Sequence, residues 1–152
     1  MEEATSERII SDPIYGRVKL PSVCVEIMDT MHFQRLRFVK CLGITDFVYP
    51  SGVHSRFTHS IGYVDAYYPL HDLNASIGSW SYKGRSKEKA FLYEIIANKN
   101  TGIDVDRFDY IRRDAYYIGI PVKLDVQALF YTRKELHSRV YQHKTVKLIH
   151  EM

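Results

Sequence analysis

The chain has 152 residues, of which 45% are hydrophobic and 26% are charged, and its net charge is +3 at neutral pH. This length and balance suit one globular domain and exclude a disordered, collagen-like or coiled-coil chain. The small positive charge is compatible with nucleotides, nucleic acid or acidic proteins as partners and selects none of them. Twelve tyrosines and seven phenylalanines could serve a core or a pocket, because tyrosine both packs and hydrogen-bonds.

The two cysteines, Cys24 and Cys41, lie on apolar periodic segments and form no C-x-x-C pair. Neither a zinc knuckle nor a disulfide framework is therefore indicated, and a reducing compartment is expected. The N-terminus has acidic residues and no signal-like apolar region, and no run approaches the roughly 18 apolar residues of a membrane span. We therefore expect a soluble, intracellular protein with no membrane partner.

Turn and cap signals predict a hairpin followed by helices in the first half of the chain. Asp12-Pro13 and Gly16 interrupt two short extended runs, which is typical of a hairpin arm. Thr30 is a favourable helix cap, and Gly43 is a typical helix stop. The expected elements are a hairpin at 7–20, helices at 21–28, 30–43 and 55–68, and a short β-like stretch at 44–50.

The second half is predicted to be helical after a loop. Residues 69–86 are rich in Gly, Ser, Asn and Pro and have no helical period, so this loop is where we expect a join between unlike pieces. Helices are expected at 87–98 and 104–118, and a final one from Asp125 to the end of the chain. The fold class is therefore mainly α, in a single domain over 1–152.

Two of the predicted helices carry polar faces, since each residue advances about 100° around a helix. The first face consists of Asp106, Tyr110, Asp114 and Tyr117, and the second of Arg133, His137, Tyr141 and Lys144. Solvation alone is the ordinary explanation for the two aspartates, but tyrosines on the same face favour a pocket. The cations border an apolar stripe, which fits snorkelling side chains and equally a phosphate pocket.

A third pattern lies in the sequence VHSRFTHSIGY. On a helix, Arg56, His59 and Tyr63 project from one side. A lone histidine in such a place is usually structural, and as a metal ligand it needs further His or carboxylate partners. Asp106 and the dipeptide His71-Asp72 are the candidates for that role, and both explanations remain open at this point.

Several stretches of the chain are similar to a known family. They are DPIYGRVKL, FQRLRFVKCLG, SRFTHSIG, YKGRSKEKAFLYEIIANKNTGIDVDRFDYIRRD and TRKELHSRVYQHK. In this order, over most of the chain, they resemble the HD-domain deoxynucleoside triphosphate (dNTP) triphosphohydrolases, in particular the vertebrate branch that also carries a SAM domain. The resemblance implies an HD-domain-like helical bundle, here partial, and metal-dependent hydrolysis of a dNTP to deoxynucleoside and triphosphate.

The resemblance also implies a metal site and a substrate pocket. His59 and Asp106 match the first and last metal ligands, and with Arg56 they are the implied catalytic residues. The residues implied for substrate binding are Arg56, Arg107, Tyr110, Asp114, Arg133, His137, Tyr141, Gln142 and Lys144. The implied metal is Zn, Fe or Mn, with Mg on the nucleotide. Such a metal polarises a phosphoryl oxygen and activates water while cations offset the developing charge.

Regulation and assembly are further implications of the resemblance. Arg8, Asp29, Gln34 and Arg37 match part of an allosteric site for GTP or dGTP, which lies at a tetramer interface in the family. A nuclear location and a homo-oligomer are implied as well. Single-stranded nucleic acid is another candidate partner, because the chain has basic and tyrosine-rich surfaces.

Departures from the family bear on activity. The family's central His-Asp pair lies in a stretch resembling C-H-D-L-G-H-G-P-F-S-H, which has no counterpart here. We interpret His71-Asp72 as a loop dipeptide at the junction of an internal deletion, with metal ligation as the alternative. The SAM domain and the C-terminal lobe are expected to be absent too. Cys41 stands where the family has a Gln beside the sugar, and Arg107 replaces a Lys.

Three functional hypotheses follow. The chain is an active dNTP triphosphohydrolase, a catalytically inactive truncated isoform that acts as an interaction or nucleic-acid-binding module, or an unstable fragment. The last hypothesis arises because losing internal helices exposes the apolar faces that they covered.

Overall fold

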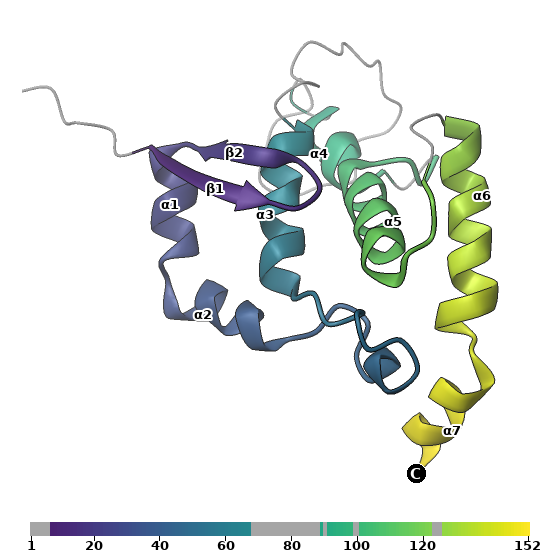
Figure 1. Ribbon diagram of the computed structural model, residues 1–152. Helices are drawn as coiled ribbons and strands as arrows, with labels where there is room; N and C mark the ends of the chain where they lie inside the picture. The colour runs from purple at the N-terminus through teal and green to yellow at the C-terminus, as the bar shows by residue number, and fades with distance from the viewer. Residues whose placement is uncertain (1–6, 68–88, 90, 99–100, 123–125) are drawn as a thin grey trace, which may run out of the picture.

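A computed structural model describes residues 7–67, 89, 91–98, 101–122 and 126–152. Its elements are β1 (Arg8–Asp12), β2 (Gly16–Leu20), α1 (Ser22–Met28), α2 (Met31–Gln34), α3 (Arg56–Tyr67), α4 (Phe91–Ile96), α5 (Val105–Ile118), α6 (Val126–Leu136) and α7 (Lys144–Glu151), with 3₁₀ helices at Arg35–Phe38 and Thr45–Phe47 and a π-helical segment at His137–Tyr141. The fold is mainly α with an N-terminal hairpin, as predicted (Figure 1).

The N-terminal hairpin forms where the sequence predicts it. β1 and β2 pair antiparallel, with Arg8 opposite Leu20 and Asp12 opposite Gly16. The Asp12 Oδ1 atom accepts hydrogen bonds from the amides of Ile14 and Tyr15 at 2.8 and 3.1 Å, which shapes the turn. Gly16 follows in the left-handed region at φ 75°, a conformation that glycine adopts without strain.

The helix predicted over 30–43 begins as expected but ends early. The Thr30 hydroxyl accepts a hydrogen bond from the Phe33 amide at 3.3 Å, which caps α2. The backbone then tightens into the first 3₁₀ helix and becomes extended at Val39. The prediction fails beyond this point because Lys40 pairs with Ser55 in an antiparallel bridge, a long-range contact that helical backbone cannot make.

The strand expected over 44–50 is wrong. Residues Thr45–Phe47 form the second 3₁₀ helix, and the Tyr49 amide donates to the Thr45 carbonyl at 2.8 Å. Thr45 is buried. The segment's backbone hydrogen bonds are local, so it needs no strand partner, although its β-branched and aromatic residues are types that favour strands.

The helices at the centre of the fold match their predicted ranges. α3 and α5 lie within a residue of their expected bounds, and Asp104 caps α5 by accepting from the Arg107 amide at 2.9 Å. Gly119 ends α5 at φ 79°. α4 is shorter than the predicted 87–98, although residues 87, 88 and 90 lie outside the described part of the chain.

The final helix predicted from Asp125 onward is broken in two. The Gln142 amide donates to the His137 carbonyl at 3.0 Å, which is a π-type bond, and the ψ of His143 is 129°, outside the helical range. The widened turn interrupts the α-helical hydrogen bonds, and the axis of α7 points in a different direction from that of α6 (Figure 1). Lys144 therefore does not share an arc with Arg133, contrary to the prediction.

Two hydrophobic clusters hold the described residues together. One joins the hairpin, α1 and α3 through Val18, Leu20, Val25, Met28, Phe57 and Ile61. The other joins α5 to α6 and the π-helical segment through Ile111, Ala115, Leu129, Leu136 and Val140. α3 packs against both β2 and α5, so it lies between the clusters. None of the described helices is long and apolar enough to cross a membrane.

Candidate nucleotide pocket

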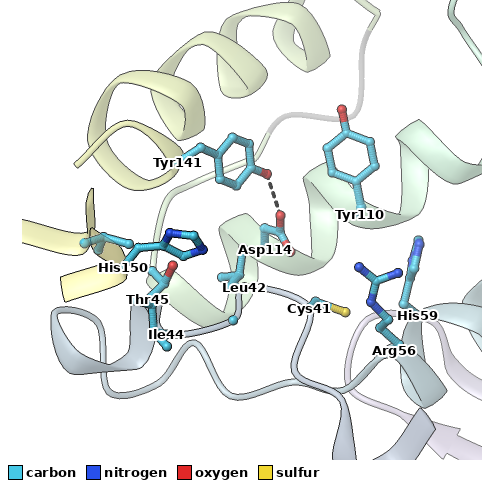
Figure 2. A pocket seen from close by; sticks show the side chains of 12 residues that line it. Cys41, Leu42, Ile44, Thr45, Arg56, His59, Tyr110, Asp114, Tyr141 and His150 are labelled. Carbon is cyan, nitrogen blue, oxygen red and sulfur yellow. Dashed lines mark hydrogen bonds between the residues drawn. The ribbon is translucent and has the colours of Figure 1, made fainter. Parts of the chain in front are cut away.

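A pocket of about 550 Å³ opens between the 41–45 segment, α3, α5, the π-helical segment and α7 (Figure 2). Its lining consists of Cys41, Leu42, Gly43, Ile44, Thr45, Arg56, His59, Tyr110, Asp114, Tyr141, Val146 and His150. Five of these, Arg56, His59, Tyr110, Asp114 and Tyr141, are predicted site residues. Tertiary packing thus brings the three predicted faces to one place.

A short extended contact builds the wall that carries Cys41 and Arg56. The Cys41 amide donates to the His54 carbonyl at 2.9 Å, and the Arg56 amide donates to the Val39 carbonyl at 2.8 Å. These bonds flank the bridge between Lys40 and Ser55. The start of α3 is thereby fixed beside the 41–45 segment, with Cys41 and Arg56 on the pocket (Figure 2).

His59 lies between two carboxylates of α5. Its Nδ1 is 2.5 Å from Asp109 Oδ2, and its Nε2 is 3.0 Å from Asp106 Oδ1. Burial alone lowers the pKa of His59, but the hydrogen bonds to Asp106 and Asp109 outweigh burial and raise that pKa to about 9. The imidazole therefore carries positive charge at neutral pH when its neighbours are these two carboxylates.

Behind His59 lies a buried ionic network that the sequence reasoning missed. Arg113 is fully buried and donates from Nε and Nη2 to the two oxygens of Asp109, at 3.0 and 2.9 Å. Its Nη1 donates to Asp12 Oδ2 at 2.8 Å. Burial works to raise the pKa of Asp109, but the hydrogen bonds from His59 and Arg113 lower it below its ordinary value. The available signal was an acid four residues before an arginine on one helix.

Asp114 is buried at the pocket floor with both of its oxygens occupied. Oδ1 is 2.8 Å from His54 Nε2, and Oδ2 accepts from the Tyr141 hydroxyl at 2.5 Å (Figure 2). Burial and then the Asp114 charge raise the pKa of Tyr141 well above its ordinary value. His54 also stacks on Tyr117, with ring centroids 4.6 Å apart. His54 was missed because no local pattern separates it from a structural histidine.

The other residues predicted for substrate binding do not line the pocket. Arg107 lies against Gly102, where an added Cβ would come within 3.0 Å of its Nη1. The His137 ring meets the Tyr141 ring edge-on at 5.0 Å. Arg133 has a buried Nε with no hydrogen-bond partner among the described residues. Gln142 lies at the end of the π-helical segment, and Lys144 begins α7 and is exposed.

The residues implied for allosteric nucleotide binding form two pairs with one another, and none of them lines the pocket. Arg8 donates to both Asp29 oxygens at 2.7 and 2.8 Å, and this bonding lowers the pKa of Asp29. Arg37 donates to Gln34 Oε1 at 2.7 Å and lies over the Phe57 ring at 3.5 Å. The Arg37 charge also lowers the pKa of Asp29, so the two pairs are neighbours.

The donors near His59 meet only part of the requirement for a metal site. His59 Nε2 and the Asp106 carboxylate converge, and both are suitable ligands for a divalent transition metal. Among the described residues, however, no group of three or more His, Cys, Asp or Glu could hold a metal ion. The dipeptide His71-Asp72 and the 69–86 loop lie outside the described residues. The described donors alone therefore do not fit a complete site.

The sequence of the chain is similar to those of known proteins. No protein-family model matches the chain. Over 95% of its length it is 27% identical to deoxynucleoside triphosphate triphosphohydrolase SAMHD1 of Gallus gallus, covering 44% of that protein. Over 97% of its length it is 28% identical to the SAMHD1 homolog of Dictyostelium discoideum, covering 48% of it. The predicted resemblance to the dNTP triphosphohydrolases is confirmed.

The likeness extends to a viral protein that is named for its HD domain. All of the chain aligns, at 23% identity, with the HD domain-containing protein L394 of Acanthamoeba polyphaga mimivirus, covering 58% of it. The mainly helical fold of this chain is thus HD-like, as the resemblance implied.

The chain spans about half the length of the curated triphosphohydrolases that it matches. The alignment with the Gallus gallus protein runs over 270 residues, although the chain has 152. A long stretch of the aligned region in that relative therefore has no counterpart in this chain.

Proposed function

We propose that this chain binds a dNTP in the pocket between α3, α5 and the π-helical segment. The supporting observation is that five residues implied for substrate or catalysis line one pocket, although they come from segments far apart in the sequence. They are Arg56, His59, Tyr110, Asp114 and Tyr141. The pocket volume of about 550 Å³ lies within the range of roughly 300–1,000 Å³ that small-molecule sites occupy.

The chemistry of the lining suits a nucleotide. Arg56 is exposed at the pocket and offers a planar, permanently charged fork to phosphate oxygens. Tyr110 and Tyr141 offer aromatic surface, and the Tyr141 hydroxyl bonds to the buried Asp114 carboxylate. Cys41 lies in the same lining, and a thiol hydrogen-bonds more weakly than an amide does. The proposed pocket therefore holds the sugar less tightly than one with a glutamine there.

The proposed reaction is hydrolysis of the dNTP to deoxynucleoside and triphosphate. It requires a transition metal, proposed as Zn, Fe or Mn, in addition to Mg on the nucleotide. His59 and Asp106 offer two donors, so His71-Asp72 or donors from another chain must complete the site for catalysis. Without those further donors, the chain is a nucleotide-binding module that does not catalyse hydrolysis. The incomplete set of metal donors supports this second candidate function.

Nucleotide binding is tested by titrating the purified chain with dATP and Mg²⁺ in a calorimeter. Loss of one charge-assisted phosphate contact costs roughly 1.5–3 kcal/mol, so Arg56→Ala weakens binding at least tenfold. Arg17→Ala, an exposed arginine on β2 outside the pocket, is the matched control and leaves affinity unchanged. Equal affinities for all three proteins would contradict the proposed pocket.

Catalysis is tested separately, by measuring triphosphate release from dATP with Mg²⁺ and Mn²⁺ present. Asp106→Ala is the matched inactive variant, and metal content is measured on the same samples. Release above that of Asp106→Ala, with close to one tightly held transition metal per chain, supports the triphosphohydrolase. Binding of dATP with no release above that variant supports the module without catalysis.

Further proposals concern regulation and location, and they follow from the resemblance. We propose that GTP or dGTP binds at Arg8, Asp29, Gln34 and Arg37, and that a homo-oligomer forms around this site. Both guanidinium groups there are exposed and could engage phosphate by exchanging their present partners. Single-stranded nucleic acid is a further candidate partner, and an intracellular, nuclear location is proposed. The chain is also proposed to be one partial HD domain over 1–152, with 69–86 at the junction.

A further inference from the structure

We propose that Asp109 is a positioning residue for the His59 imidazole, and that Arg113 and Asp12 hold Asp109 in place. The three carboxylate and guanidinium groups form one continuous chain of hydrogen bonds from the hairpin turn to His59. The hairpin thereby supports the pocket from behind, in addition to packing in the first hydrophobic cluster.

The geometry at Asp109 leaves its carboxylate a single orientation. Arg113 binds both oxygens of Asp109 with a planar fork, at 3.0 and 2.9 Å, which fixes the plane of the carboxylate. Oδ2 then accepts from His59 Nδ1 at 2.5 Å. Neither Asp109 nor Arg113 has an exposed side chain, so water does not compete for these bonds.

Arg113 is itself fixed from its far side. Its Nη1 donates to Asp12 Oδ2, and the other oxygen of Asp12 binds the amides of Ile14 and Tyr15 in the hairpin turn. Asp12 is 7% exposed. A turn residue of the hairpin thus determines where the Arg113 fork lies, and through it where Asp109 lies.

Close packing of α3 on α5 completes the arrangement. A Cβ added at Gly62 would lie 2.0 Å from Asp109 Oδ1 and 2.6 Å from Arg113 Nη2. Such distances are far inside van der Waals contact, so only a glycine lets α3 approach this pair. The same approach brings His59, on α3, within hydrogen-bonding distance of Asp109.

The consequence is that the two ring nitrogens of His59 have different surroundings. Nδ1 is directed at Asp109, which leaves Nε2 directed at Asp106 on the pocket side. A carboxylate that holds one ring nitrogen fixes the orientation of the other. The catalytic role of His59 rests on the proposed function, whereas the orientation of its ring does not.

The test is an NMR experiment on histidine-labelled protein without nucleotide. In the wild type, Nδ1–H of His59 gives a proton signal that is protected from exchange with water. The double variant Asp109→Leu/Arg113→Met replaces the buried pair with apolar side chains and also leaves Asp12 Oδ2 without its guanidinium partner, which lowers stability. We expect this variant to lose the protected Nδ1–H signal while its circular dichroism stays that of the wild type.

The matched control is Glu135→Leu/Arg139→Met, which removes an ion pair of the same sequence spacing in which Arg139 is exposed and Glu135 is partly buried. This control variant is expected to keep the protected Nδ1–H signal of His59. Persistence of the protected signal in Asp109→Leu/Arg113→Met would overturn the proposal. Because no nucleotide is present, failure of dATP binding would leave this result unaffected.

A second variant keeps the proposal testable if the double variant does not fold. Asp12→Asn retains the acceptor for the hairpin turn and removes the negative charge beside Arg113. The His59 resonances are expected to shift in the folded variant, because Arg113 and then Asp109 readjust. His59 resonances identical to those of the wild type would overturn the outer link from Asp12.

Discussion

Gly62 sets the distance between α3 and α5. A side chain at this position has no room, because its Cβ would lie 2.0 Å from Asp109 Oδ1. We expect Gly62→Ala to lower the free energy of unfolding by about 3 kcal/mol, the upper part of the usual cost of overpacking. Urea denaturation measures this value.

Ser60→Ala is the control for Gly62→Ala on the same helix. Among the described residues, the Ser60 hydroxyl donates to the Arg56 carbonyl within α3, so its loss is expected to change stability by at most about 0.5 kcal/mol. Equal stabilities for Gly62→Ala and the wild type would show that the helices separate at no cost.

Cys41 is a pocket residue whose reactivity depends on pH. Burial, and secondly the Asp114 charge, raise the pKa of its thiol to about 12. Only the thiolate reacts with iodoacetamide, so in a Cys24→Ser background the rate of alkylation should rise about tenfold per pH unit between pH 8 and 10. Mass spectrometry at timed intervals measures the rate.

The unfolded state provides the comparison for Cys41. In urea the thiol regains an ordinary pKa of about 8.5, and its alkylation rate levels off above that pH. A native rate that levels off near the same pH would contradict burial of Cys41 in the pocket wall.

At the scale of the elements, α5 carries Asp106, Tyr110 and Asp114 of the site and depends on its cap. Asp104 accepts from the Arg107 amide at 2.9 Å and from the Asn98 amide at 2.9 Å. Asp104→Ala is expected to lower the free energy of unfolding by about 1–2 kcal/mol. Asp104→Asn, which keeps a capping oxygen, retains most of the stability. The free energies of unfolding of both variants are measured by thermal and urea denaturation. Equal destabilisation of Asp104→Ala and Asp104→Asn would contradict the role of the cap.

The elements also differ in how far local sequence could predict them. α3 and α5 were predictable because the apolar period, the cap at Asp104 and the stop at Gly119 all act within a few residues. The 30–43 helix and the 44–50 strand were mispredicted because the Lys40–Ser55 bridge and the local 3₁₀ bonds override propensity. No local pattern marks the π-helical segment that ends α6.

At the scale of the whole molecule, α3 packs against both β2 and α5, and the buried Arg113 joins α5 to the hairpin through Asp12, so the two hydrophobic clusters are expected to unfold together. Leu20 belongs to one cluster and Leu136 to the other, and each is at most 1% exposed. Leu20→Ala and Leu136→Ala are each expected to cost about 3 kcal/mol. Because these contacts link the clusters, each variant should still unfold in a single transition.

Coincidence of the transitions in far-UV and near-UV circular dichroism checks this expectation. Separate transitions for the two clusters, or strong binding of a hydrophobic dye by the native chain, would favour the hypothesis of an unstable fragment. A single transition with little dye binding would show that the chain folds as one cooperative unit.

The sequence by itself determined the mainly helical class, the hairpin and five of the twelve residues that line the pocket, because periodicity, caps and family motifs are local. It placed Arg56, His59, Tyr110, Asp114 and Tyr141 on helical faces without showing that these faces meet. Only the tertiary structure decided that they share a pocket, that Asp109 bonds to both His59 and Arg113, and that a π-helical turn separates Lys144 from Arg133. Those outcomes depend on contacts between residues far apart in the chain, whose geometry is set by packing and by the need to pair every buried charge.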